Sequence, residues 1–438
     1  MPPLPGIAAR NMDLLGLTMV DLIALALPET VKIKVDFYDD AQKALLLASA
    51  AGSVLQALPS ELTISTSDLC GYYNYYKLRP GVRKFSSRGE VFEAWRTTLG
   101  QIDGLVRFGN GSIQLEMVAG TDTGVLGHIG EAVGLCVADK IHRLHEADWR
   151  RIPHTTANKI LDFEYRASDG AMPITIETKG AGAADNRQKP SNVSGHKASI
   201  IEKKSNSANA AAIAGICYGT IAVLSDSPSS VAQCWLVDPP GTADADPFGF
   251  KLLCRLEFIA AWMRFISPRS ALGAALGTRI ATLQAIGPKA ELDRVKLCKV
   301  SGEPFADTVF SGEAPSRNPF FAVQSAVSGR AIAGSVSVLS PRDAFFLGIR
   351  EELVAYAVRQ DFNELNGYGF EPEVVGAVLN CCIPAARFKR EFAPLQFPGV
   401  ENIGGYHRFR MDGTFYQTRS GLVFGILPIP QDWTRVRE

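Results

Sequence analysis

The sequence lacks several features that would point directly to a function. It contains no Cys-x-x-Cys pair and no GxxxxGK[ST] loop, so it signals no zinc ribbon, no thioredoxin-like redox site and no ATP-driven motor. It also lacks an excess of charge of either sign, because 45 Lys and Arg balance 45 Asp and Glu. The balance argues against a protein that coats nucleic acid through bulk charge, although positive charge can still gather locally.

Long uninterrupted apolar runs are missing as well. The most apolar stretch, residues 12–27, carries Asp13 and Asp21 and is short for a transmembrane helix. We expect it to form an amphipathic helix that packs on the body of the protein. The eight cysteines are scattered, mostly in apolar surroundings, as is typical of buried thiols in a reducing compartment. These features predict a soluble cytoplasmic protein with no membrane partner.

The length of the chain indicates more than one domain. It has 438 residues, of which 46% are hydrophobic, enough for two or three domains with cores of their own. We predict an N-terminal α/β accessory region (1–118), a central core (119–240) and a C-terminal α/β domain (241–438). A segment rich in Pro, Gly and Asp at 239–247 marks the second boundary. The predicted fold class is therefore mixed α/β (α+β).

The central region contains the stretch LDFEYRASDGAMPITIETKG, residues 161–180. Two short runs in it alternate with a period of two on either side of a Ser-Asp-Gly turn signal, which predicts a β-hairpin. In the second strand Glu177 and Lys179 share one face. Asp162 on the first strand can join them, so the hairpin brings two carboxylates and one ammonium together on one sheet surface.

Such a cluster is costly unless it has a use, because like charges repel and buried charges lose hydration. A divalent cation removes that cost, and Mg²⁺ commonly takes one or two carboxylates together with water and phosphate. The metal lowers the pKa of a bound water and makes it a nucleophile near neutral pH. Lys179 can then orient that water or stabilise the charge that develops on a phosphate. The cluster therefore favours metal-dependent hydrolysis of a phosphate ester.

An Asp followed about 15 residues later by Glu-x-Lys, across a hairpin, resembles the pattern of the PD-(D/E)xK nuclease superfamily. The resemblance covers roughly residues 120–240. It implies a restriction-endonuclease-like core, in which helices flank a mixed central sheet. It also implies that Asp162 and Glu177 hold Mg²⁺, for which Mn²⁺ can substitute, and that Lys179 is the catalytic lysine.

Three residues leave details of the match open. The proline of the family name is absent, because Leu161 precedes Asp162. Glu164 lies on the same strand face as Asp162, so the assignment of the metal ligand between them is not settled. Many family members add a catalytic glutamate from the helix before the hairpin, and Glu131 fits that role in the first turn of a helix expected at 127–145. An ordinary acid favoured by the helix dipole explains Glu131 about equally well.

Two basic stretches could contact nucleic acid, since cations reach phosphates and aromatic faces stack on bases. Residues 70–89 interleave tyrosines with Lys and Arg and contain no acid; the alternative is a strand and loop whose tyrosines pack on the domain. Residues 180–209 are rich in Gly, Ser, Asn and basic residues, which predicts a surface loop that either closes over DNA or is simply disordered. The predicted nucleic-acid contacts are Tyr75, Lys77, Arg79, Arg83, Lys84, Arg187, Lys189 and Lys197.

Elsewhere the sequence predicts local structure only. Ser340-Pro341 supplies an N-cap followed by Pro, which predicts a helix to about Arg359. Asp412-Gly413 predicts the turn of a hairpin. His142 and His145 have helical spacing, but no further zinc ligand accompanies them, which favours a solvated helix end.

Together these features predict a Mg²⁺-dependent nuclease that hydrolyses DNA and resembles a restriction or phage-defence effector. One alternative is a non-catalytic nucleic-acid-binding or interaction protein that keeps a degenerate nuclease fold. Another is a structural protein in which the charged cluster is an ordinary surface hairpin. The C-terminal domain could read DNA sequence, bind a partner or form a homodimer, and the sequence does not choose among these roles.

Overall fold

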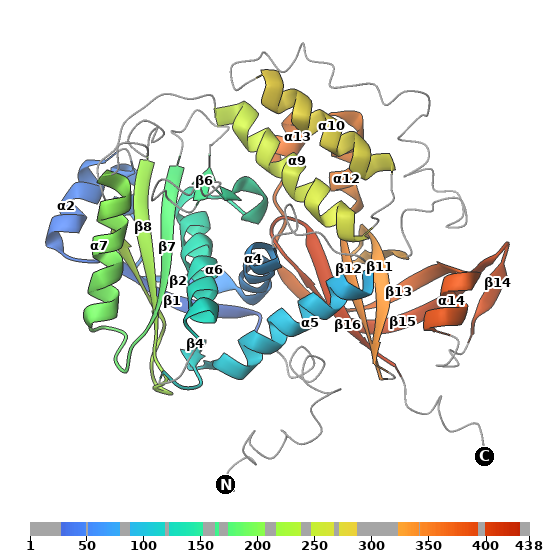
Figure 1. Ribbon diagram of the computed structural model, residues 1–438, viewed down its shortest axis with the longest axis horizontal. Coiled ribbons are helices and arrows are strands. Elements are labelled where there is room, and N and C mark those ends of the chain that lie inside the picture. Colours follow the sequence, from blue (N-terminus) through green and yellow to red (C-terminus); the bar gives the residue numbers. More distant parts are fainter. Residues whose placement is uncertain are drawn as a thin grey trace, which may run out of the picture.

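Two seven-stranded sheets, one in each half of the molecule, form the framework of the computed structural model (Figure 1). Helices flank the first sheet and fill the space between the two halves (Figure 1). The structure describes residues 28–49, 51–78, 88–118, 122–151, 163–165, 174–205, 216–237, 247–266, 271–286, 323–340, 342–392 and 399–429. In this part of the chain the protein is a mixed α and β structure, in agreement with the predicted class.

The first sheet is mixed and has the strand order β2-β1-β9-β8-β7-β6-β5. Strand β7 is parallel to β8, and β1 is parallel to β9, whereas the other neighbours are antiparallel. The strands are β1 (Thr30–Phe37), β2 (Glu61–Ser65), β5 (Arg150–Arg151), β6 (Phe163–Tyr165), β7 (Ile174–Gly182), β8 (Ile216–Leu224) and β9 (Gln233–Val237). Strands β1 and β2 thus extend the sheet of the central region, so the expected accessory region (1–118) and the expected core (119–240) share one sheet.

Two helices pack closely on opposite faces of this sheet. Helix α6 (Thr123–His142) lies against β7, and a Cβ atom on Gly130 would come within 2.2 Å of the Gly180 Cα atom. Helix α7 (Ser191–Ser205) lies on the other face, where a Cβ atom on Gly219 would come within 2.6 Å of a side-chain carbon of Ile200. Glycine is needed at both contacts because only a residue without a side chain allows so close an approach.

Helix α7 occupies a stretch for which the composition predicted a loop. Its apolar residues Val193 and Ile200 are fully buried and form a cluster with Trp235, Ile221 and other residues of the sheet. Burial of these side chains stabilises the helix although Gly, Ser and Asn disfavour it, because tertiary packing overrides weak local preferences. The prediction of a loop at 180–209 is therefore wrong for residues 180–182, which end β7, and for α7, whereas residues 183–190 between these two elements do form a loop.

The second sheet is antiparallel and closes on itself. Strand β13 pairs with both β10 and β15, which joins six strands into a ring, while β14 is attached to the outside of β15. The interior of the ring is filled by apolar side chains such as Phe346, Leu379 and Phe415. The strands are β10 (Val323–Val327), β11 (Arg330–Ser340), β12 (Asp343–Arg350), β13 (Glu373–Pro384), β14 (Glu401–Ile403), β15 (Tyr406–Gln417) and β16 (Leu422–Pro428).

Two local predictions fail in this sheet. Strand β12 takes the first part of the helix expected after Ser340, and helix α12 begins only at Glu351. Strand β12 is buried on both faces, and such a short apolar run cannot be distinguished from a buried helix by periodicity alone. Asp412-Gly413 lies within β15 instead of forming a turn, because a Cβ atom on Gly413 would come within 2.4 Å of Leu427 and the glycine serves this close contact.

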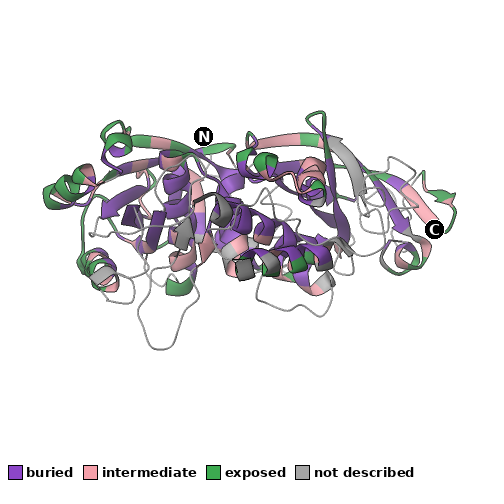
Figure 2. Cartoon of the chain, turned by 90° about the horizontal axis from the view of Figure 1, so that it is seen from above, coloured by how far each residue is buried: buried purple, intermediate pink, exposed green. Residues whose placement is uncertain are grey.

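Helices and a short hairpin connect the two halves through one continuous hydrophobic core (Figure 2). Trp95 and Trp262 lie at its centre, and the ring of Trp95 is 5.6 Å from that of Phe345 and 5.4 Å from that of Phe424 in the second sheet. None of the helices in the described part of the chain combines the length and apolar character that a membrane crossing requires. The remaining elements are α2 (Asp40–Ala48), α3 (Gly52–Gln56), α4 (Thr66–Leu78), α5 (Arg88–Leu105), β3 (Val106–Gly109), β4 (Ser112–Leu115), the 3-10 helix η2 (Glu146–Asp148), α9 (Pro247–Ile266), α10 (Ala271–Ile286), α12 (Glu351–Arg359), α13 (Phe362–Gly367) and α14 (Ala385–Glu391).

The contact between α6 and β7 should be sensitive to a single methyl group. We expect Gly130→Ala to lower the free energy of unfolding by roughly 3 kcal/mol, because the added Cβ atom would overlap the Gly180 backbone. Gly127→Ala on the same helix is the matched control: its Cβ atom meets nothing within 4 Å, and the gain in helix propensity should stabilise the protein by up to about 1 kcal/mol. Chemical denaturation of both variants tests this, and equal stabilities would contradict it.

Candidate functional site

Glu177 and Lys179 lie in the middle of β7 with their side chains on the face that helix α7 covers. The Glu177 side chain is 0% exposed, and its Oε1 atom accepts a hydrogen bond from the Nζ atom of Lys203 at 2.5 Å. The ammonium of Lys179 forms an ion pair with the same oxygen. The structure thus brings together the predicted pair of β7 and adds a lysine from α7 that the sequence did not single out.

The geometry of β7 and α7 explains why Lys203 lies beside Glu177. Side chains alternate along β7, so that Thr178 contacts α6 while Glu177 faces α7. On α7, residues three, four and seven positions apart share one face. His196, Ile200 and Lys203 have this spacing, and Ile200 fills the gap above Gly219. The seating of Ile200 therefore holds Lys203 beside the carboxylate.

The electrostatics of the cluster follow from the burial of the carboxylate. A buried carboxylate is costly without a cation or hydrogen-bond donors close by, and the two ammonium groups supply both. They are partly open to solvent, at 22% exposed for Lys179 and 15% for Lys203. Burial and the Lys179 ammonium lower the pKa of His196, although a hydrogen bond to the Gly180 backbone acts in the opposite direction. Among the contacts described, the cluster therefore joins two partly exposed ammonium groups to one buried carboxylate.

The strand that precedes β7 is described only in part. Strand β6 pairs with β7 in antiparallel register, with Phe163 opposite Ile176 and Glu164 opposite Thr175. Asp162 lies outside the described residues, directly before β6. The hairpin pairing of the two strands is thus confirmed, whereas the choice between Asp162 and Glu164 as the ligand of β6 stays a prediction.

Glu131 belongs to a different cluster. It lies more than two turns from the start of α6, so it is not a first-turn acid of that helix. Its Oε2 atom accepts a hydrogen bond from Arg151 at 2.7 Å and lies 3.1 Å from Nδ1 of His128. Helix α6 packs on the face of β7 opposite to the one that Glu177 occupies. The structure therefore does not bring Glu131 together with Glu177 among the contacts it describes.

The first basic stretch contributes less open surface than predicted. The ring of Tyr75 packs 5.2 Å from Phe258 and 5.8 Å from Trp262, so this tyrosine belongs to the core and not to a stacking platform. The stretch begins as helix α4, where Tyr72 and Tyr73 are buried, and it is not the strand considered in the alternative. Lys77 is half-buried in the last turn of α4. Arg79, Arg83 and Lys84 lie outside the described residues.

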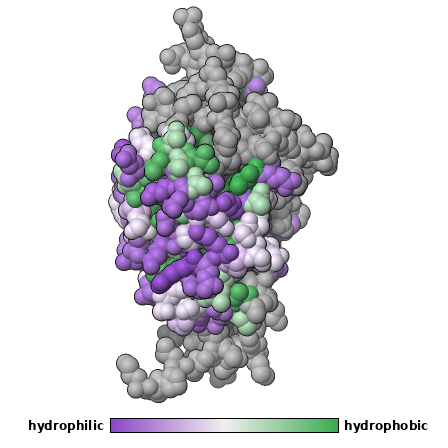
Figure 3. Space-filling view, turned by 90° about the vertical axis from the view of Figure 1, so that its left-hand side faces the viewer, coloured by the Kyte–Doolittle hydropathy of each residue, from purple (hydrophilic) through white to green (hydrophobic). Residues whose placement is uncertain are grey.

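The second basic stretch holds its lysines on aromatic rings. Lys189 lies over the rings of Trp235 and Tyr38, at 4.4 and 4.7 Å from their centroids. Lys197 lies 4.6 Å from the Tyr38 centroid and forms an ion pair of 2.5 Å with Asp39. Arg187 is exposed. Figure 3 shows that the face carrying α2 and α7 is mostly hydrophilic, so these cations remain on a polar surface while their positions are fixed.

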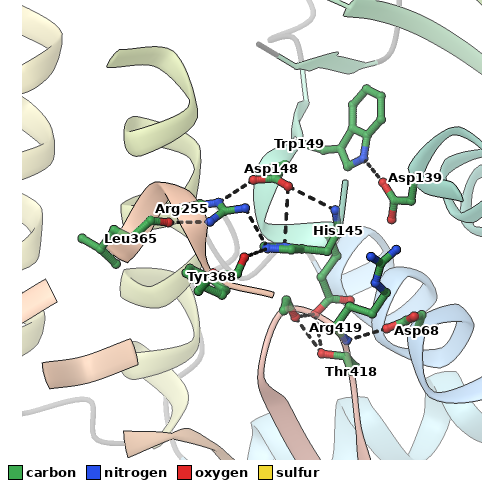
Figure 4. Close-up of polar contacts among 12 residues, drawn as sticks. Asp68, Asp139, His145, Asp148, Trp149, Arg255, Leu365, Tyr368, Thr418 and Arg419 are labelled. Carbon is green, nitrogen blue, oxygen red and sulfur yellow. Dashed lines mark hydrogen bonds and ion pairs between the residues drawn. The ribbon is translucent and has the colours of Figure 1, made fainter. Parts of the chain in front are cut away.

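A second group of polar residues is buried at the junction of the two halves (Figure 4). The side chain of Asp148 is 0% exposed and accepts a hydrogen bond of 2.5 Å from the Nε atom of Arg255, which is 2% exposed. Arg255 also donates to the Leu365 carbonyl and to Nε2 of His145, and its guanidinium lies 4.3 Å from the centroid of the Tyr368 ring. His145 is buried and stacked on Tyr368, so the prediction of a solvated helix end is wrong for this residue.

Three further buried acids, Asp68, Asp139 and Glu146, lie at the same junction. None of them forms a salt bridge among the contacts described. Burial raises the pKa of Asp68 to about 6 and raises those of Asp139 and Glu146 well above their usual range. At least one oxygen of each acid has a neutral partner: the Trp149 indole donates to Asp139, the Arg419 amide donates to Asp68, and the Ser420 hydroxyl donates to Glu146 at 2.5 Å. Because the whole group is buried, we interpret it as a clamp between the halves and not as an open site.

The clamp should depend strongly on Asp148. We expect Asp148→Asn to lower the free energy of unfolding by about 3–5 kcal/mol, because it leaves the buried Arg255 guanidinium without its carboxylate. The control is Glu61→Gln, which breaks an exposed ion pair of 3.0 Å with Lys32 and should cost less than about 1 kcal/mol. Urea unfolding measures both, and a small effect of Asp148→Asn would refute the interpretation.

The end of α6 should make stability depend on pH. His142 lies 3.0 Å from the Tyr218 hydroxyl, and burial lowers its pKa to about 4. The unfolded chain, with a histidine pKa near 6.5, takes up the proton first as the pH falls, so the stability contributed by neutral His142 is complete above pH 6.5 and is lost toward pH 4. From pH 7 to 5 the wild type should lose about 1–2 kcal/mol more than His142→Gln. Parallel pH profiles in denaturant titrations would speak against this shift.

With this geometry described, comparison of the chain with known proteins adds no further information. No protein-family model, no curated protein and no solved structure matches it.

Proposed function

We propose that this chain is a metal-dependent nuclease of PD-(D/E)xK type that hydrolyses phosphodiester bonds of DNA. The observation that carries the proposal is the meeting of Glu177 and Lys179 on one face of β7, with the carboxylate buried and the ammonium partly open to solvent. A carboxylate and a lysine in this relation can hold a cation and stabilise a phosphate that gains charge.

The order of the elements around β7 supports the proposal. Helix α6, the strands β5 to β7, helix α7 and the strands β8 and β9 follow one another in the chain and form a three-layer unit. The resemblance implies a helix before the hairpin, a hairpin ending in Glu-x-Lys, and a mixed sheet flanked by helices, and the described elements agree with this arrangement. The arrangement of elements and the Glu-x-Lys motif are both needed for the argument, because Glu-x-Lys alone also occurs on ordinary amphipathic strands.

The donor set fits a hard cation such as Mg²⁺, with Mn²⁺ as a substitute. Glu177 supplies one carboxylate, and Mg²⁺ commonly completes its shell with water and substrate phosphate. No three His, Cys, Asp or Glu side chains gather as a metal cluster in the ranges that the structure describes, so a second carboxylate would come from Asp162, outside them. When bound, the cation would lower the pKa of an attacking water and polarise the phosphate.

Lys179 would act on the substrate. Its ammonium, two residues from Glu177 on the same strand face, would orient the attacking water or stabilise the extra negative charge on the phosphate. Water adds to phosphorus, the bond to one ester oxygen breaks, and that oxygen leaves with a proton. The described contacts of Glu131 lie outside this step, because its carboxylate is bound to Arg151 and lies beside His128 on the other side of β7.

A non-catalytic protein with a degenerate nuclease fold is the second candidate. The observation that favours it is the double ion pair of Glu177, which neutralises the buried carboxylate by protein cations alone. On this reading Glu177 and its lysines tie α7 to the sheet, and nucleic acid would bind without any dependence on metal.

Cleavage assays separate the two candidates. Plasmid DNA, single-stranded DNA and RNA are incubated with the full chain and Mg²⁺, Mn²⁺ or EDTA. We expect metal-dependent cutting that falls at least about 100-fold in Lys179→Ala, because removing one group that stabilises the transition state typically costs this much, and that also falls in Glu177→Gln and Asp162→Ala.

The matched control is Lys32→Ala, which also removes a strand lysine paired with a glutamate, but on the exposed surface of β1. It should cut like the wild type. If the wild type is inert with every metal while its fold is intact, or if Lys179→Ala cuts as well as Lys32→Ala, the proposed function is wrong.

A further inference from the structure

We propose that the turn between β15 and β16 (residues 418–421) is a proton-controlled latch, which docks on Asp68 and Glu146 of the first half while these acids are protonated and is released as they ionise. The inference does not depend on the proposed nuclease activity, because the latch lies at the junction of the two halves and shares no residue with β7 or α7. It makes the coupling between the two halves respond to pH.

The turn reaches across the junction into the buried acids of the first half (Figure 4). The backbone amide of Arg419 donates to Oδ1 of Asp68 on α4 at 2.7 Å, and the Ser420 hydroxyl donates to Oε1 of Glu146 on η2 at 2.5 Å. Thr418 and Ser420 are both 0% exposed, so the turn is buried where it docks. The docking of the turn thus depends on the state of two carboxyl groups.

One oxygen of Glu146 has no hydrogen-bond partner in the described part of the chain. Its Oε1 atom accepts from Ser420, whereas its Oε2 atom is buried and unpaired. This second oxygen lies directly over the backbone of Gly71, where a Cβ atom would come within 2.4 Å of it. A buried charge without a partner costs far more free energy than a neutral acid does. The position of Glu146 therefore favours its protonated form.

The neighbouring charges favour the protonated form as well. Burial raises the pKa of Glu146 well above its usual range, and the negative charges of Asp68 and Asp139 raise it further. The hydrogen bond from Ser420 acts in the opposite direction but does not cancel this shift. Burial raises the pKa of Asp68 to about 6, although the amide and the charge of Arg419 lower it. Both acids that hold the turn thus keep their protons to a higher pH than ordinary carboxyl groups do.

Two cations act on these acids without forming a salt bridge to them among the contacts described. The charge of Arg419 lowers the pKa of Asp68 and that of Asp139, and the charge of Lys140 lowers the pKa of Asp68. The other titratable groups in the surroundings are Tyr72 and Tyr75 on α4, Cys136 on α6, Tyr218 on β8, Tyr368 and Glu371 beyond α13, and the pair of Arg255 and Asp148 with His145 beside it.

The direction of the pH response follows from these shifts. When the turn lifts off, water reaches Asp68 and Glu146 and their pKa values return toward the ordinary range, so the docked state binds protons more tightly than the released state. The free energy of docking is therefore largest below about pH 4 and falls as the pH rises. The part that Asp68 contributes is lost toward about pH 6, and the part that Glu146 contributes is lost at higher pH.

Hydrogen–deuterium exchange of the full chain reports how often the turn lifts off. The amides of Arg419 and Leu422 donate to Asp68 and to the Thr418 hydroxyl, and they exchange when these hydrogen bonds open. After correction for the intrinsic rate at each pH, their protection in the wild type should fall at least about tenfold from pH 5 to pH 8, since a pKa raised by one unit changes the docking equilibrium tenfold. The amides of β12, which pairs with β11 and β16, serve as the reference for global unfolding.

Two variants remove the titration of the latch. Glu146→Gln keeps the shape of the side chain but cannot ionise, so at pH 8 it should protect the turn at least about tenfold more than the wild type does, and at pH 5 it should differ little. Asp68→Asn keeps an oxygen for the Arg419 amide and should weaken the fall in protection between pH 5 and pH 7. The matched control is Asp412→Asn, an exposed acid on β15, which should leave the fall unchanged.

The outcomes separate a latch from an ordinary hydrogen-bond contact. Equal protection of the wild-type turn at pH 5 and pH 8 overturns the inference, and so does a fall that Glu146→Gln and Asp68→Asn both keep in full. If Glu146→Gln lowers the protection equally at both pH values, Glu146 is only a structural partner of Ser420 and the latch is refuted. Protection that becomes independent of pH in Glu146→Gln, with Asp412→Asn behaving as the wild type does, supports the latch.

Discussion

The burial of one carboxylate beneath a helix is the constraint on which the first half of the molecule depends. Glu177 sits under α7 with no exposed surface, and a carboxylate buried in this way needs cations or hydrogen-bond donors close by. Lys179 meets this need from the same strand, and Lys203 meets it from the helix above. The helix can approach so closely only because Gly219 leaves room for Ile200. The close packing of α7 on the sheet and the pairing of Glu177 with Lys203 thus depend on each other.

The two halves of the chain are joined by a different kind of contact. Their common core is aromatic and apolar around Trp95 and Trp262, whereas the buried clamp around Asp148 and Arg255 is polar and directional. Apolar burial supplies most of the stability of such a junction but is tolerant of shifts. Buried hydrogen bonds penalise any misalignment, because each unpaired group costs free energy. The clamp therefore fixes the relative position of the sheets more than it holds them together.

The sequence was informative where the alternation of side chains along one strand was clear, although it misplaced a turn at Asp412-Gly413 and a helix over β12. The alternation around Glu177 predicted the hairpin partner and the shared face of Glu177 and Lys179. It was uninformative where distant segments meet: α7 is a helix because Ile200 and Val193 find a buried surface, and no local property of that Gly- and Ser-rich stretch reveals it. Glu131 and Tyr75 illustrate the same limit. Glu131 contacts Arg151, which lies outside its own helix, and Tyr75 packs on Trp262, which lies far along the chain. Lys203 could be found only by reading its helical spacing from Ile200.

The pairing of β1 with β9 has a consequence for how the protein is made. Val35 and Cys234 are neighbours in the sheet, yet about 200 residues separate them in the chain. At typical rates of synthesis the ribosome needs roughly 10–40 s to cover that distance. Until β9 is made, the edge of β1 that pairs with it in the folded protein has no partner strand. The newly made chain thus carries an exposed strand edge for many seconds, a state in which binding to a chaperone protects against aggregation.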